Sequence, residues 1–492
     1  MWKETAMVFA DLLFIFLFFA VCLSLTTFLK TNKARNIVLL VFSLVFYAWS
    51  GPWLLLILCG MTLVCYFGAL RIEKLASEGD RVKAKKGMKL TLILTLVLCL
   101  GTLAFFKYTT FLVSEWNRIF ALSSAAPNIV LPIGISFYTF QLITYVVDVY
   151  RGDVPAQKKY YLVLLYAALF HQCIAGPIVR YQTVADELEN RELNLSDFSR
   201  GVTRFAVGLG KKVLLANALG SLADSIVPTS GTGIEKTAAV SIFLGSLAYM
   251  LQIYLDFSAY SDMAIGMGLM AGFHYQENFR YPYMADSMTD FWRRWHISLS
   301  SFFRDYVYIP LGGNRKGVPR QYLNLFIVWA LTGIWHGAGW NYLFWGLYFF
   351  LILCIEKRVI DLKSEPSKKA YIVRRVVTLV LLFFGWILFR YPDLSVMGKV
   401  LGGLICLNGN PFWDLSTSLT LLNNCFLIPA AIVACTPIIP YLHSLLDYVA
   451  FRKKSFRPVM RILSVALPIC LVVLSVLYLA GQTYNPFLYT QF

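Results

Sequence analysis

The segment TGIWHGAGWNY, residues 332–342, places a single histidine, His336, in an apolar stretch of the chain. Titratable groups at membrane depth usually face a protein interior or a wet cavity and serve a pathway or a reaction. Gly333, Gly337 and Gly339 remove side-chain bulk around the imidazole, so we expect room for a substrate there. Burial favours the neutral imidazole, which can accept a proton from a hydroxyl or a thiol. A solitary histidine is more often a satisfied core residue, but the three glycines shift the prediction toward a general base.

A second histidine, His296, lies in a segment rich in arginine and aromatic residues, DSMTDFWRRWHISLSSFFRDYVYIPLGGNRKG, residues 286–317. Guanidinium forks match phosphate oxygens, so the cluster suits a diphosphate. The candidate phosphate-binding cations are Arg293, Arg294, Arg304, Arg315 and Lys316. The same composition also suits an amphipathic helix that lies at the lipid headgroups. Taken alone, the segment favours this simpler interpretation.

Two aspartates, Asp256 and Asp262, lie in the otherwise apolar segment QIYLDFSAYSDMAIGMG. Asp256 is four residues from Tyr260, and Ser258 is four residues from Asp262. Each carboxylate therefore has a hydroxyl on the same helix face. The pattern supports a structural hydrogen bond and a place in the lining of a functional chamber about equally.

The composition places the chain in a lipid bilayer. Of its 492 residues 58% are hydrophobic, 16% are aromatic and only 14% are charged. A helix needs about 20 apolar residues to cross the hydrocarbon core, and such runs recur along the chain. We therefore predict an all-α polytopic membrane protein.

Plain apolar runs occupy both ends of the chain, and basic loops separate them. The runs expected to be helical spans are 8–29, 37–49, 52–70, 90–106, 347–355, 376–389, 421–448 and 462–479. Short basic loops stay cytoplasmic, so we expect loops 71–89, 357–375 and 452–461 on that side. The polar stretch 181–204 predicts a short surface helix with Ser196 near its N-cap.

The net charge of +17 does not predict a nucleic-acid partner. The basic residues lie mainly at the ends of apolar segments, where membrane topology and anionic lipid headgroups explain them. The ten cysteines show no paired spacing, so we expect no disulfide framework and no metal site. A bound cofactor is not expected either.

The chain is predicted to form one integral membrane domain, residues 1–492, with three successive parts. These are N-terminal scaffold helices (1–107), a catalytic core (108–348) and C-terminal helices (349–492). In the core, Gly, Pro, Trp and charged residues interrupt the apolar runs. Broken helices at membrane depth survive only where they are buried in protein or line a wet cavity. We expect the chamber there, lined by Asp256, Asp262, Trp295, Trp335 and Asn341.

Five long motifs resemble the membrane-bound O-acyltransferase family, and within it the bacterial branch typified by the alginate O-acetylation membrane protein. They are PIGISFYTFQ, IAGPIVRY, YLDFSAYSDMAIG, DFWRRWHISLSSFFRDYVYIPLGGNR and TGIWHGAGWNYLFWGLYF, with a weaker echo in the terminal YNPFLYTQF. They occur in the family's order and are densest between residues 132 and 348. By motif match, His336 falls on the family's invariant histidine and His296 on its second catalytic position.

The resemblance implies a ring of tilted helices around a thinned central chamber, with about 11 transmembrane helices plus re-entrant and interfacial ones. It implies acetyl-CoA as the donor, reached from the cytoplasm, and a bacterial cytoplasmic (inner) membrane location. The acyl group would serve O-acetylation of an extracytoplasmic polysaccharide, such as an alginate-like exopolysaccharide, cellulose or a cell-wall glycan. The final acceptor is expected to be reached through a partner that resembles an extracytoplasmic serine-hydrolase-like acetyltransferase.

The implied mechanism is acyl transfer with His336 as the general base. His296 would orient His336 or hydrogen-bond the thioester carbonyl as negative charge develops. Two other classes remain open at this point. A transporter would use Asp256, Asp262 and the broken helices as a path, although transporters of that kind usually show matched halves. A non-catalytic export subunit for a cell-surface glycan would tolerate the loss of both histidines.

Overall fold

The computed structural model of the protein describes residues 7–78, 80–122, 124–173, 176–360, 366–481 and Leu488. Throughout these ranges the regular elements are helices, and no strand occurs. Among the described residues, six helices are long and apolar enough to cross a membrane. They are α3 (Leu54–Ala76), α4 (Arg81–Ile119), the continuous run Leu195–Ile226, α11 (Ala239–Met270), α16 (Lys368–Arg390) and the run Lys454–Ala480. A helix satisfies its own backbone hydrogen bonds in lipid, and the chain is a multi-pass helical membrane protein.

The predicted runs 8–29 and 37–49 form helices that are shorter or more polar than these six. The first contains the π-helical segment η2 (Phe14–Phe19) followed by α1 (Ala20–Phe28), and the second lies within α2 (Asn32–Trp49). Thr31 caps α2 by accepting a hydrogen bond from the backbone N–H of Ala34 at 3.3 Å. The chain therefore has apolar helices in addition to the six that are long and apolar enough to cross a membrane.

Contacts between helices divide the chain into two compact units. The first unit comprises Met1–Phe205 and Ser261–Glu277, and the second comprises Ala206–Tyr260 and Asn278–Phe492. Each unit draws on two separate stretches of sequence. The sequence predicted three successive parts, 1–107, 108–348 and 349–492. This division stays a prediction.

The first unit contains helices α1 to α8. Helix α3 contacts α4, α5 (Ile135–Arg151) and α6 (Tyr160–Ala168), and α2 contacts α7 (Phe170–Cys173) and α8 (Tyr181–Asn190). Gly134, with φ +71°, immediately precedes α5. This backbone conformation suits glycine, so Gly134 marks the start of α5. The terminal motif YNPFLYTQF lies outside the described residues except for Leu488.

The prediction of one short surface helix over 181–204 is wrong. The stretch contains the end-to-end pair α8 and α9 (Leu195–Gly210), and α9 begins the long apolar run Leu195–Ile226. The first turn of α9 is capped by Asn194, whose Oδ1 accepts from the Asp197 backbone N–H at 2.7 Å. An asparagine side chain is as good an N-cap as serine, and the cap therefore lies two positions before Ser196.

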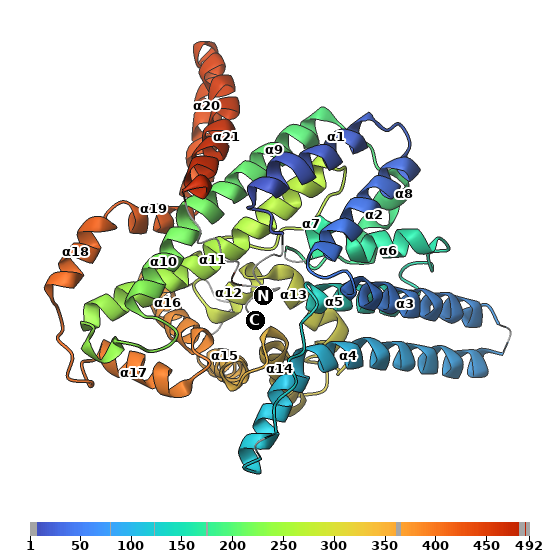
Figure 1. The fold of residues 1–492 in the computed structure, drawn as a ribbon, viewed down its shortest axis with the longest axis horizontal. Helices are drawn as coiled ribbons and strands as arrows, with labels where there is room; N and C mark the ends of the chain where they lie inside the picture. The colour runs from blue at the N-terminus through green and yellow to red at the C-terminus, as the bar shows by residue number, and fades with distance from the viewer. Residues whose placement is uncertain are drawn as a thin grey trace. The chain divides into compact units, whose positions relative to one another are not determined.

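The second unit contains the short helices and the close helix pairs that surround the candidate site. Its elements are η3 (Lys211–Ala216), α10 (Asn217–Ile226), η4 (Ile234–Lys236), η5 (Pro282–Met284), α12 (Met288–Arg294), α13 (Ile297–Phe303), η6 (Arg304–Tyr308), α14 (Val318–His336), α15 (Trp340–Val359), α16, α17 (Leu394–Leu404), α18 (Leu415–Asn423), α19 (Leu427–Ala434), α20 (Ile438–Arg452), η7 (Lys454–Phe456) and α21 (Arg457–Ala480). Helices α14, α15 and α16 are neighbours, and α20 runs beside α21 (Figure 1). The site therefore rests on helices close in sequence.

The apolar run 421–448 does not form one span. It is divided among α18, α19 and α20, and α18 and α19 meet at an angle of 57°. The second break falls where Pro437 precedes α20. Proline disfavours helical backbone in the residue before it, so composition alone overestimated the length of this helix.

Candidate functional site

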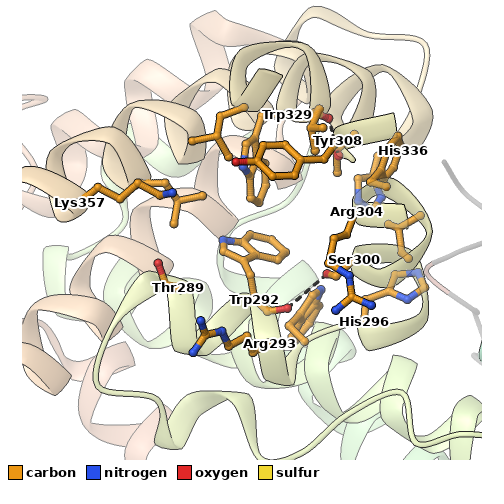
Figure 2. Close-up of a pocket in the computed structure, with 17 residues that line it drawn as sticks. Thr289, Trp292, Arg293, His296, Ser300, Arg304, Tyr308, Trp329, His336 and Lys357 are labelled. Atoms are coloured by element: carbon orange, nitrogen blue, oxygen red, sulfur yellow. Dashed lines mark hydrogen bonds between the residues drawn. The ribbon is translucent and has the colours of Figure 1, made fainter. Parts of the chain in front are cut away.

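A cavity of about 310 Å³ lies within the second unit and is lined by α12, α13, η6, α14 and α15 (Figure 2). Most of its surface area is apolar, and the apolar lining residues are Trp292, Trp295, Leu299, Phe303, Leu325, Val328, Trp329 and Leu353. Its polar lining comprises Thr289, Arg293, His296, Ser300, Arg304, Tyr308, Thr332, His336 and Lys357. The cavity has the composition typical of a small-molecule site, an apolar wall with a few convergent polar groups.

Both histidines singled out in the sequence line this one cavity. His296 comes from the junction of α12 and α13, and His336 is the last residue of α14. In the view of Figure 2 they lie on the side opposite Lys357. The fold thus brings together two imidazoles that are far apart in the sequence. Their catalytic roles stay predictions.

His336 is held in an aromatic surround. Its ring meets Trp345 edge to face at a centroid distance of 4.9 Å and Phe389 edge to face at 5.4 Å. Trp335, expected to line the chamber, is not among the lining residues, but its ring centroid lies 5.1 Å from that of His336 and 6.1 Å from that of His296. Edge-to-face contacts fix ring orientation. The imidazole plane of His336 is therefore set by packing.

The glycines around His336 serve helix packing, which corrects the expectation that they leave room for a substrate. A side chain at Gly337 would overlap the ring of Tyr342, and one at Gly333 would overlap the Tyr342 backbone. Gly346 likewise allows α15 to approach the Trp329 carbonyl on α14. Small residues let helix backbones approach closely in membranes. These positions hold α15 against the end of α14, next to His336.

His296 occupies a backbone conformation that is uncommon for a residue with a side chain. Its φ is +43° and its ψ is +55°, in the left-handed region. Such a residue costs free energy and persists only when its surroundings hold it. The kink separates α12 from α13, so the segment is two short helices instead of one amphipathic helix. Burial lowers the pKa of His296 to about 3, and the ring is neutral near pH 7.

The start of α12 is fixed by a buried carboxylate that sequence inspection missed. Glu356 of α15 accepts hydrogen bonds from the backbone N–H groups of Met288 (2.5 Å) and Thr289 (3.0 Å) and from the Thr289 hydroxyl (2.5 Å). Ser287 accepts from the Asp290 N–H at 3.1 Å. These bonds satisfy donors that a helix start leaves open. In the sequence, Glu356 directly precedes Lys357, and this position indicated only the polar end of an apolar helix.

The predicted donor-binding cations separate into two groups. Arg293 and Arg304 are exposed residues that line the cavity. Arg294 pairs with Asp290 at 2.8 Å, and it is not among the lining residues; neither are Arg315 and Lys316, in the turn after η6. Lys357, which sequence inspection did not select, lines the cavity too. Arg304 also binds Asp305, with Nε 2.6 Å from Oδ1.

Of the predicted chamber-lining residues, Trp295 lines the cavity. Asp256, Asp262 and Asn341 do not. The Asn341 amide donates to the Phe389 carbonyl at 3.0 Å, and so supports the residue that packs on His336. Asp256 is paired with Lys212 of η3 at 2.7 Å, and both side chains are almost fully buried. In the first unit, Asp262 binds Arg204 at 2.8 Å. Asp256 and Asp262 are therefore paired with cations of other helical segments, whereas the sequence pattern predicted hydroxyl partners on their own helix.

The described residues contain no group of three or more His, Cys, Asp or Glu side chains placed to hold a metal ion. The cysteines whose side chains are described are free thiols. Cys65 and Cys99 approach most closely, with 3.4 Å between their sulfur atoms in the interior of the first unit. The polar side chains that line the cavity carry imidazole, guanidinium, ammonium and hydroxyl groups.

A multi-pass helical membrane protein with a two-histidine cavity is the class that the fold and site define. Residues 159–392, which contain every cavity-lining residue, match the model of the membrane-bound O-acyltransferase family. The chain is 39% identical to the probable alginate O-acetylase AlgI of Pseudomonas putida, over 99% of this chain and 100% of that protein. It is 42% identical to the protein of the same name from Pseudomonas aeruginosa, over 80% of this chain and 74% of that one. A peptidoglycan O-acetyltransferase of Helicobacter pylori is 33% identical, over 80% of this chain and 78% of its own length.

The chain belongs to the membrane-bound O-acyltransferase family, and it is an acyltransferase.

Proposed function

We propose that this protein transfers an acetyl group from cytoplasmic acetyl-CoA for the O-acetylation of a polysaccharide outside the cytoplasmic membrane. The observation that carries the proposal is the convergence of His296 and His336 on one cavity whose lining also includes cations. The relatives support the acetyl group, because their names describe O-acetylation of alginate and of peptidoglycan. We extend the acceptor class to an alginate-like exopolysaccharide, cellulose or a cell-wall glycan.

The proposed chemistry uses a neutral imidazole as a proton carrier. His336 takes the proton of the acceptor hydroxyl while the hydroxyl oxygen bonds to the thioester carbon. The carbon–sulfur bond then breaks, the acetyl group becomes an ester, and the proton returns to the departing thiolate of CoA. General base catalysis of this kind contributes about 10²- to 10⁴-fold. The buried, aromatic surround of His336 keeps its ring oriented for this step.

The cations that line the cavity are the proposed contacts for the donor's phosphates. Arg293, Arg304 and Lys357 are exposed residues of the cavity lining. Guanidinium and ammonium groups bind phosphate oxygens. Of the predicted set, Arg293 and Arg304 are preferred to Arg294, because Arg294 is not among the residues that line the cavity. Arg315 and Lys316 remain candidates for the outer part of a long donor.

At the level of the whole chain we propose the family's arrangement, a ring of about 11 tilted transmembrane helices around a thinned chamber in the bacterial cytoplasmic membrane. Acetyl-CoA approaches from the cytoplasm, and the acetyl group leaves on the opposite side. The final acceptor is reached through an extracytoplasmic serine-hydrolase-like acetyltransferase. Basic residues at the ends of apolar segments support this orientation.

Purified protein in proteoliposomes tests the proposal with acetyl-labelled acetyl-CoA and a soluble glycan acceptor. Transfer or slow hydrolysis of the label is expected for the wild type and should be abolished in His336→Ala. His296→Ala should be strongly impaired, and His296→Asn, which restores a hydrogen-bonding group, should retain more activity. His443→Ala is the matched control, because His443 is an exposed residue of α20 paired with Asp447. Solute flux without acetyl transfer, or normal transfer in folded His336→Ala, would refute the proposal.

A further inference from the structure

His296 has a hydrogen-bond partner that neither the motif nor the family resemblance singled out. Asn278, which is completely buried, lies in the segment before η5 and runs alongside the turn between α12 and α13. Its Oδ1 lies 3.1 Å from His296 Nδ1. The same oxygen accepts from the Ser298 hydroxyl at 2.9 Å and from the Ser298 backbone N–H at 3.3 Å.

These contacts determine which nitrogen of His296 carries the proton. A backbone N–H can only donate, so the Asn278 atom that it meets is the amide oxygen, an acceptor. The imidazole nitrogen that faces this oxygen must then donate, and the proton lies on Nδ1. The Ser298 hydroxyl lies closer to the Asn278 oxygen than to His296 Nδ1, which is 3.4 Å away, so it does not compete for the donor position.

A neutral imidazole has one proton, and its other nitrogen is an acceptor. We propose that Asn278 is a positioning residue that fixes His296 in the Nδ1–H tautomer and thereby makes Nε2 a proton acceptor. The inference rests on the proposed function for its catalytic use, and it decides between the two roles predicted for His296. An Nε2 lone pair cannot donate to the thioester carbonyl, but it can accept a hydrogen bond or a proton from a group in the cavity.

Asn278 also holds the backbone of the same residue pair. Its carbonyl accepts from the Ile297 N–H at 2.9 Å, and the Arg280 N–H donates to the Arg294 carbonyl at 3.0 Å. The segment around Asn278 therefore binds the chain on both sides of the left-handed His296. Strained residues persist where neighbouring contacts over-determine them. One side chain and its backbone thus set both the direction and the protonated nitrogen of the imidazole.

Nitrogen NMR of the purified protein with ¹⁵N-labelled histidine tests the tautomer directly. The chain has only five histidines, and the His296 signals are assigned by their loss in His296→Asn. The wild type should show a protonated Nδ1 and an unprotonated Nε2 near pH 7. Ser298→Ala, the control, should keep that pattern, and Asn278→Ala should lose it. A wild-type His296 protonated on Nε2 would overturn the proposal, even if no Asn278 variant folds.

Turnover separates positioning from a merely structural role. Asn278→Ala should lower kcat at least about tenfold with little change in the KM for acetyl-CoA, because proton transfer, and not donor binding, is impaired. Asn278→Asp keeps an acceptor for Nδ1–H and should recover part of the rate. Its carboxylate favours the imidazolium, so its activity should fall at a higher pH on the acid side than in the wild type.

The titratable or charged side chains that line the same cavity, His336, Arg293, Arg304, Lys357 and Tyr308, are unchanged in all these variants. An altered tautomer with unchanged kcat would refute the positioning role and leave the acyltransferase function standing. Absence of acetyl transfer in the wild type would instead refute the proposed function, while the NMR spectrum would still decide the tautomer.

Discussion

Removing one partner of the Lys212–Asp256 ion pair should destabilise the protein more than removing both. Lys212 Nζ lies 2.7 Å from Asp256 Oδ1, with side-chain exposures of 1% and 2%. The Leu488 backbone N–H donates to Asp256 Oδ2 at 3.1 Å, and the Tyr260 ring centroid lies 5.9 Å from the ammonium. Two unit charges at this separation attract by about 6 kcal/mol at an effective dielectric constant of about 20.

That attraction offsets the free-energy cost of taking both charges out of water. If one partner is removed, the desolvation cost of the remaining buried charge is no longer compensated. Asp256→Asn preserves the shape but strands the Lys212 ammonium, and Lys212→Met strands the carboxylate. Each should lower the free energy of unfolding by about 3–5 kcal/mol. The double variant Lys212→Met with Asp256→Leu removes both charges. Its free energy of unfolding should fall by no more than about 2 kcal/mol, mainly because the hydrogen bond from the Leu488 N–H is lost.

The measurement is unfolding of each variant by sodium dodecyl sulfate in mixed micelles, followed by tryptophan fluorescence, with Ser444→Ala on the exposed face of α20 as a control. The two single variants should unfold at clearly lower detergent fractions than the double variant. Equal stability of Asp256→Asn and the wild type would refute the reasoning. So would a double variant as unstable as the sum of the two singles, because the charges would then not be coupled.

Glu356→Ala should destabilise the protein by about 2–4 kcal/mol by exposing the start of α12, and Glu356→Gln, which keeps one acceptor, should lose less in the same assay. Gly337→Ala should cost about 1–3 kcal/mol because its methyl group overlaps Tyr342, whereas Gly398→Ala, in open space, should be neutral or slightly stabilising. Because the folded-state pKa of His296 is about 3 against an ordinary 6.5, the unfolded chain binds this proton first as pH falls. Stability should therefore drop by up to about 1.4 kcal/mol per pH unit between pH 6.5 and about pH 3, and less steeply in His296→Asn. Arg304→Lys should weaken acetyl-CoA binding roughly tenfold, about 1–2 kcal/mol, in a titration of purified protein, if its planar fork binds the donor.

The sequence located the candidate site well but explained parts of it wrongly. It selected His296 and His336 by motif, and both line the cavity. It assigned the glycines near His336 to substrate space, whereas Gly333 and Gly337 accommodate Tyr342. Both interpretations rest on the fact that glycine has no side chain. Only the position of α15 shows that Tyr342, and not a substrate, occupies the space.

Helix ends were predictable where the signal is local. Gly134 before α5 and the proline before α20 act on their own backbone. The second was overlooked because the surrounding residues are uniformly apolar. The start of α9 depends on Asn194, an equally local signal, which was passed over in favour of Ser196. These errors concern the choice among nearby signals and not missing information.

Composition and local pattern determined by themselves that the chain is helical, that it lies in a membrane and that two histidines are its leading candidates for chemistry. Tertiary structure alone decided the partners of the buried polar groups. Asp256 had hydroxyl neighbours on its own helix but pairs with Lys212 of η3, and His296 depends on Asn278, 18 residues away. The physical reason is that a buried charge or proton donor takes whichever partner the packed helices bring within hydrogen-bond distance. Periodicity describes one helix at a time, so it cannot state which helices meet.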